Sequence, residues 1–157
     1  MIPLPSPAEG VAIALDPAEG VWHLRFGETS RRLRPWRWGE RRRLVAASTR
    51  GGRFDGPAFT AGLAAMLYDP APPAELAPLH ALLALDLLGV GEGPAPAPLA
   101  AAEARLAVRF GWMPGALEAE PAAGLDALLA GLDEPAPAPH APPPGWNSIR
   151  VMEEPDG

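Results

Sequence analysis

The sequence contains no cysteine and no lysine. Without cysteine, the chain has no disulfides, no thiolate ligands for a metal and no thiol nucleophile, which fits a reducing compartment such as the cytoplasm. Without lysine, every cationic side chain except histidine is an arginine, and the 17 glycines and 22 prolines belong to the same bias. This composition is typical of a GC-rich genome and by itself indicates no chemistry.

Long apolar runs are also absent. No segment is long and apolar enough to cross a membrane, and residues 1–10 contain three prolines where a signal peptide would have its apolar core. At 157 residues, the chain has the length of one compact domain with appended segments. We therefore expect a single core, no signal peptide and no membrane span.

Few groups in the sequence could catalyse a reaction. His23, His80 and His140 are spread along the chain, and no carboxylate lies at the spacing of a metal site. No serine lies in the motif of an activated nucleophile. We interpret the neighbouring carboxylates Glu118 and Glu120 as solubilising charge. The sequence thus predicts a protein that is not an enzyme, with no catalytic residue, no cofactor and no metal site.

Charge is distributed unevenly along the chain. Between Arg25 and Arg53, ten arginines face only Glu28 and Glu40, so this segment carries +8 and the remainder −14 of the total −6. Such asymmetry can steer an acidic partner to one face of the protein, or it can be neutralised by the protein's own acidic helices. The sequence leaves both explanations open.

The N-terminal part of the sequence predicts a small antiparallel sheet. Apolar residues alternate in residues 11–15 and again in residues 21–26, and the turn residues between them indicate a hairpin. Residues 29–33 can supply a third strand, which matters because an isolated two-stranded hairpin is marginally stable. Residues 1–9 contain three prolines, and we expect them to form an extended, frayed lead.

The sequence pattern of the rest of the chain predicts mainly helices. Helical patterns occupy residues 40–49, residues 75–88 and residues 99–110. Two further helices begin with an N-cap at Asp55 and with Pro121. We therefore predict an α+β fold, mainly α, with a small N-terminal antiparallel β element followed by a helical bundle, a Pro-rich linker and a C-terminal tail.

This pattern divides the chain into successive parts. Its expected parts are an extended lead (1–9), a β element with an Arg/Trp-rich segment (10–53), a helical domain (54–132), a Pro/Ala linker (133–144) and a C-terminal interaction segment (145–157). The alternating prolines and alanines of the linker exclude a packed core and predict a stiff, extended spacer of about 3 Å per residue.

The Arg/Trp-rich residues 33–44 are the first candidate for a binding site. Pro35 disfavours helix, so a helix is expected to start near Trp38 or Gly39 with three arginines around its first turns. Cations are unfavourable there because of the helix dipole, so acidic groups of the protein or of a partner must offset them. The alternative to docking is a solvated face. The expected partner-binding residues are Arg34, Trp36, Trp38, Arg41, Arg42 and Arg43.

The C-terminal segment is a second candidate. Trp146 is followed by Ile149 and Val151, which alternate as in a strand, and tails without a binding role usually lack such large apolar groups. Ile149 and Val151, on one side of a strand, could add to an exposed sheet edge of this chain or of a partner. The expected partner-binding residues of this segment are Trp146, Ile149 and Val151. The alternative is a frayed end without a role.

Two short motifs carry a resemblance to a known family. The first is LRP at residues 33–35 with WGERR at residues 38–42, and the second is FGW at residues 110–112 followed by a proline and a helix. Both resemble small tail-assembly or baseplate-associated proteins of tailed phages and phage-derived contractile injection systems. The Pro-rich spacer and the Trp146 segment depart from that pattern. The resemblance adds Phe110 and Trp112 to the expected partner-binding residues, and its matched positions are Leu33, Arg34, Pro35, Trp38, Gly39, Glu40, Phe110 and Trp112.

The resemblance implies a non-enzymatic assembly chaperone or structural adaptor of a phage-tail-like or contractile injection particle. Its partners would be tail, tube or baseplate proteins, and it would be cytoplasmic, either free or incorporated in the particle. An alternative is a nucleic-acid-binding accessory protein, in which arginines pair with phosphates while Trp36 and Trp38 stack on bases. The acidic total charge disfavours nucleic acid as a partner. A third reading is a Trp/Arg segment lying on a membrane surface.

Overall fold

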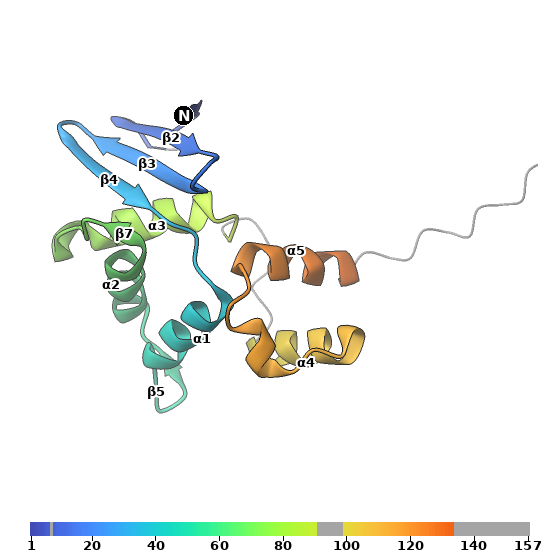
Figure 1. The fold of residues 1–157 in the computed structure, drawn as a ribbon. Helices are drawn as coiled ribbons and strands as arrows, with labels where there is room; N and C mark the ends of the chain where they lie inside the picture. Colours follow the sequence, from blue (N-terminus) through green and yellow to red (C-terminus); the bar gives the residue numbers. More distant parts are fainter. Residues whose placement is uncertain (7, 91–98, 134–157) are drawn as a thin grey trace, which may run out of the picture.

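The computed structural model describes residues 1–6, 8–90 and 99–133. Within them, a five-stranded antiparallel sheet has the order β1-β2-β3-β4-β7, and helices surround one side of it and extend away from it (Figure 1). This arrangement confirms the predicted α+β, mainly helical fold. The strands of the sheet are β1 (Ile2–Leu4), β2 (Val11–Asp16), β3 (Val21–Phe26), β4 (Thr29–Leu33) and β7 (Tyr68–Asp69).

The helices follow in chain order after the first four strands. A separate two-stranded ribbon, β5 (Thr49–Arg50) with β6 (Arg53–Phe54), joins the first two helices. Two short 3-10 helices, η1 (Ala74–Leu76) and η2 (Pro114–Leu117), precede longer helices. The α-helices are α1 (Trp38–Ala47), α2 (Gly56–Leu67), α3 (Ala77–Leu87), α4 (Leu99–Phe110) and α5 (Ala122–Asp133).

The predicted hairpin of β2 and β3 is present, and β4 adds the third strand. In the register, Ile13 lies opposite Leu24, so the apolar residues of neighbouring strands share one face. Gly20 and Gly27 have positive φ angles of 66° and 59° at the two hairpin turns, a conformation that side chains other than glycine rarely adopt. Alternation in the sequence therefore determines which face of the sheet is buried.

The expectation of a frayed lead at residues 1–9 is wrong. Ile2–Leu4 forms the edge strand β1, in which Pro3 lies opposite Ala14 and Leu4 opposite Ile13. Proline is tolerated on an edge strand because only one side of the strand needs to supply hydrogen-bond donors. The apolar side chain of Leu4 packs against the core, which helps to hold this strand on the sheet.

Helix α3 covers the apolar face of the sheet (Figure 1). The ring of His80 on α3 lies 4.4 Å from that of Phe26 on β3, and the hydroxyl of Tyr68 on β7 donates a 2.8 Å hydrogen bond to the His80 carbonyl. Helix α3 also packs along α2, whose residues Leu63 and Leu67 are buried in the core. The central helix predicted at residues 75–88 thus connects the sheet to the helical part.

Local sequence signals account for the helix ends. Asp55 caps α2 as predicted, and its Oδ1 accepts a 3.0 Å hydrogen bond from the Ala58 amide. Helix α4 has the predicted bounds, and α5 begins immediately after Pro121. In the part of the chain that the structure describes, no helix has the length and apolar character needed to cross a membrane.

Helices α4 and α5 lie side by side and away from the sheet (Figure 1). Both are next to α1, which follows the extended residues between β4 and the first helical turn. The Arg/Trp-rich segment therefore lies at the point where the N-terminal sheet unit meets the α4 and α5 pair. This position determines what its side chains contact.

Candidate functional site

The backbone of residues 36–39 pairs with the residues that precede α5. The Trp38 amide donates to the Glu120 carbonyl at 2.9 Å, and the Gly39 amide donates to the Glu118 carbonyl at 3.1 Å. The Ala122 amide donates to the Trp36 carbonyl at 3.2 Å. Pro35 keeps the chain extended at this point, which leaves its backbone free for this pairing. We call this contact the Arg–Trp junction, formed by Trp36, Trp38, Arg41 and Arg42 with Glu103, Glu118 and Asp126.

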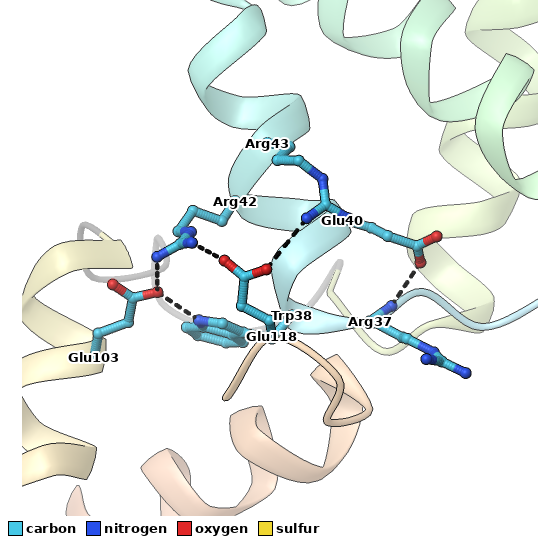
Figure 2. A network of polar contacts seen from close by, with 7 residues as sticks. All are labelled: Arg37, Trp38, Glu40, Arg42, Arg43, Glu103 and Glu118. Carbon is cyan, nitrogen blue, oxygen red and sulfur yellow. Dashed lines mark hydrogen bonds and ion pairs between the residues drawn. The ribbon is translucent and has the colours of Figure 1, made fainter. Parts of the chain in front are cut away.

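Both tryptophans of the junction are buried, with exposed fractions of 2% for Trp36 and 1% for Trp38. The Trp38 indole Nε1–H donates a 2.9 Å hydrogen bond to Oε1 of Glu103 on α4, so its polar atom is satisfied inside (Figure 2). The prediction that these indoles form an accessible partner-binding surface is wrong. Their large apolar surfaces are buried where α1 meets α4 and α5, and they belong to the protein's own core.

Arg41 is buried as well, and it is also unavailable to a partner. Its Nη1 lies 2.8 Å from both carboxylate oxygens of Asp126 on α5. The guanidinium carbon lies 5.5 Å and 5.4 Å from the ring centroids of Trp36 and Trp38, within the range of cation–π attraction. The expected partner-binding role of Arg41 is therefore corrected to a structural one, because its charge is used to hold α5 on α1.

Arg42 and Arg43 are satisfied less completely. Arg42 forms an ion pair with Glu118 and lies 3.6 Å from Glu103, while Arg43 reaches the second oxygen of Glu118 at 3.4 Å (Figure 2). One carboxylate thus serves two guanidinium groups. The Arg43 side chain is 65% exposed and remains accessible from solvent. The interpretation of Glu118 as mere solubilising charge is wrong, because it links η2 to α1.

Glu40 offsets the arginines at the start of α1. Its Oε2 accepts a 2.9 Å hydrogen bond from the Arg37 amide, and both carboxylate oxygens accept from the Arg34 guanidinium at 2.8 Å and 3.0 Å. Hydrogen bonding to Arg34 lowers the pKa of Glu40, and the same contact raises the pKa of Arg34. The helix N-terminus is therefore stabilised by a carboxylate at the position that the helix dipole favours.

Gly39 allows the close approach of the two backbones. A Cβ atom built at this position would lie 3.0 Å from the Glu118 carbonyl oxygen and 3.2 Å from its Cα. Those atoms belong to backbone, which cannot rotate away as a flexible side chain can. A glycine at the second residue of α1 is thus required by the packing of the junction.

A shallow groove lies beside the junction and shares Glu118 with it. We call it the arginine groove. Arg37, one of its lining residues, is exposed, and in the described residues 1–6, 8–90 and 99–133 no carboxylate lies within ion-pair distance of its guanidinium. Figure 2 shows the Arg37 guanidinium extending away from the Glu40 carboxylate. The groove is lined by Arg34, Arg37, Glu40, Arg43, Glu118 and Ala119.

A second accessible feature lies where α4 ends. The rings of Phe110 and Trp112 are stacked with centroids 5.0 Å apart, and Phe110 is 40% exposed. The next residue, Met113, is 74% exposed, and Trp112 is partly buried against the core. We call Phe110, Trp112 and Met113 the aromatic elbow. It is an exposed apolar surface at the C-terminal end of α4.

The other expected site residues lie elsewhere. Trp146, Ile149 and Val151 are outside the described residues. His80 is buried under the sheet, where its Nδ1–H donates to the Leu76 carbonyl at 2.9 Å. Burial lowers the pKa of His80, the hydrogen bond to Leu76 partly opposes this, and the nearby cation of Arg31 adds to it. Among the residues that the structure describes, no group of three or more histidines and carboxylates could hold a metal ion.

Sequence reasoning missed the three carboxylates that complete the junction. They lie on three different elements: Glu103 is on α4, Glu118 is the C-cap of η2, and Asp126 is on α5. No local sequence motif links these carboxylates to the arginines. The available signal was the split of charge along the chain. The sequence left open whether the arginines attract an acidic partner or are neutralised by the protein's own acidic groups. At the junction the structure shows neutralisation by the protein's own carboxylates.

The two motifs of the expected tail-assembly family therefore have different positions. Residues 33–42 lie in the junction, and residues 110–112 form most of the aromatic elbow. No known protein family, curated protein or solved structure matches this chain. Membership of the tail-assembly family therefore stays a prediction.

Proposed function

We propose that this chain is a non-enzymatic assembly chaperone or structural adaptor that binds other protein chains, and that these belong to a phage-tail-like or contractile injection particle. The particle is proposed from the resemblance of residues 33–42 and 110–112. The binding mode is proposed from the surfaces that the fold leaves accessible. The partners would be tail, tube or baseplate proteins.

The aromatic elbow is the observation that carries the proposal. Phe110 and Met113 are large, exposed apolar side chains next to the half-buried Trp112. Aromatic residues and methionine are enriched at the centres of protein–protein interfaces, and hot spots are enriched in tryptophan. Because Trp112 stacks on Phe110 and packs on the core, a partner would meet a surface that is already ordered.

The junction has a supporting role in this proposal. Its hydrogen bonds and ion pairs connect α1 to α4 and α5, and α4 in turn ends at the elbow. The arginines and tryptophans would then act by positioning the elbow instead of touching a partner. The nucleic-acid alternative loses its stacking surface, because Trp36 and Trp38 are both buried.

Direct binding to purified particle proteins tests the proposal. We expect the full-length chain to bind a tube, sheath or baseplate protein encoded in the same genome, with a Kd measurable by isothermal titration calorimetry. Replacing Phe110 and Met113 together by serine should weaken binding about tenfold or more, because hot-spot truncations typically cost about 2 kcal/mol. Both side chains are exposed, so the fold should be retained.

A matched control is Leu82→Ser, which removes an exposed apolar side chain from α3, in another part of the protein. This variant should bind as the unchanged chain does. Equal affinity for the elbow variant and the control would refute the elbow as the contact surface. Failure of every tube, sheath and baseplate protein to bind would refute the assignment to the particle.

A further inference from the structure

The arginine groove has a surplus of positive charge. Arg34 and Glu40 neutralise each other, and Glu118 is shared between Arg42 and Arg43. Arg37 has no ion-pair partner among the described residues and is exposed. An acidic segment lying in the groove would supply a carboxylate to Arg37 and a second carboxylate to Arg43, which shares Glu118 with Arg42.

The chain contains such a segment within reach. Glu153, Glu154 and Asp156 follow α5 after the Pro/Ala-rich residues 134–144. Helix α5 has 12 residues, so its ends are about 18 Å apart, and the groove residue Ala119 lies just before its first turn. A proline-rich chain can extend by about 3 Å per residue, so residues 134–144 alone can span about 30 Å. The tether is longer than the path back along α5.

Tethering also makes a weak contact effective. Exposed ion pairs are individually weak and are screened by salt, so a free acidic peptide would bind poorly to this groove. A segment of the same chain is present at an effective concentration set by the length and stiffness of its tether, which a free peptide lacks. Charge complementarity and reach together favour an intramolecular occupant.

We infer that the acidic segment Glu153–Glu154–Pro155–Asp156 of this chain docks in the arginine groove, with its carboxylates against Arg37 and Arg43. The contact would fold the C-terminal segment back along α5. It depends on the groove and on charge, and it does not depend on the elbow or on any particle protein.

The absence of cysteine allows a direct test, because introduced cysteines are the only thiols in the chain. Ala119→Cys in the groove and Pro155→Cys in the acidic segment should form a disulfide within one molecule in a glutathione buffer. The measured quantity is the effective concentration of the two thiols. Changing Glu153, Glu154 and Asp156 to their amides should lower it about fivefold, as expected for two lost surface ion pairs.

Matched arginine variants show whether the groove itself is responsible. Arg37→Gln with Arg43→Gln should lower the effective concentration to the same extent as the tail variant. Arg50→Gln with Arg53→Gln removes the same charge from the β5–β6 ribbon and should leave it unchanged. Raising the salt concentration to about 1 M should act like the tail variant, because the screening length then falls to about 3 Å.

Several results would overturn the inference. An effective concentration that does not respond to the tail amides would show that the acidic residues make no contact with the groove. An equal response to both arginine pairs would indicate general attraction to a basic protein. A disulfide that forms only between two molecules would assign the groove to the segment of a second copy.

Discussion

Replacing Asp126 by asparagine tests whether Arg41 is a structural cation of the junction. The Arg41 guanidinium is buried within cation–π distance of both indoles, and its Nη1 lies 2.8 Å from both oxygens of Asp126. Asparagine has nearly the same shape but no charge, so the substitution leaves a buried cation without its counter-charge. The expected result is a loss of stability without a change of fold.

The size of the loss follows from the burial of the pair. Removing one partner of a fully buried ion pair typically costs about 3 to 5 kcal/mol. The Asp126 side chain is 36% exposed, so water reaches the carboxylate and screens part of the interaction. The remaining cation–π contacts and the new amide oxygen also compensate in part. We therefore expect a loss of about 1 to 3 kcal/mol in the free energy of unfolding.

Urea unfolding, followed by circular dichroism, measures this loss. Asp133→Asn is the control. Asp133 is also a carboxylate on α5 that forms an ion pair with an arginine, at 2.6 Å from Arg105, but this pair lies on the surface. An exposed pair contributes about 0 to 1 kcal/mol, so the control should lose much less. Equal losses for the two variants would refute the view that the buried pair holds α5 on α1.

Further predictions concern the same contacts. Gly39→Ala should lower stability by about 1 to 3 kcal/mol in thermal unfolding, because its Cβ would meet backbone at 3.0 Å, whereas Gly115→Ala meets nothing and should have little effect. Trp38→Phe removes the indole donor to Glu103 and part of a buried ring, so it should cost about 2 to 4 kcal/mol in urea unfolding, from the lost charged hydrogen bond and the cavity together. Because the pKa of His80 is lower in the folded than in the unfolded state, the unfolded chain binds its proton first, so stability should fall as the pH drops below about 6.5. Urea midpoints between pH 8 and pH 5 measure this loss, and His80→Phe should reduce it.

Much of the fold could be predicted because its signals are local. The alternation in residues 11–15 and 21–26 indicates strands that pair, and Asp55 is an N-cap that hydrogen-bonds three residues ahead. Helix α4 begins and ends where the apolar pattern of residues 99–110 begins and ends. In each case the interaction that fixes the element joins residues close together in the sequence.

The site could not be predicted in the same way, because its partners are distant. Arg41 and Asp126 are 85 residues apart, and Trp38 and Glu103 are 65 residues apart. A segment rich in arginine and tryptophan has the composition of a binding surface, and the same composition suits a core contact when carboxylates lie opposite. In the sequence the arginines form a cluster, whereas the carboxylates that pair with them are spread among the many acidic residues of the rest of the chain.

Exchange of the Trp38 indole proton shows whether the Arg/Trp-rich segment is buried or accessible. In the structure this indole lies inside the protein, and its Nε1–H donates a 2.9 Å hydrogen bond to Glu103. After transfer to D₂O, the Nε1–H resonance of Trp38, assigned through the Trp38→Phe variant, should persist far longer than that of a free tryptophan. An Nε1–H that exchanges as fast as free tryptophan would contradict the account and restore the segment as an accessible surface.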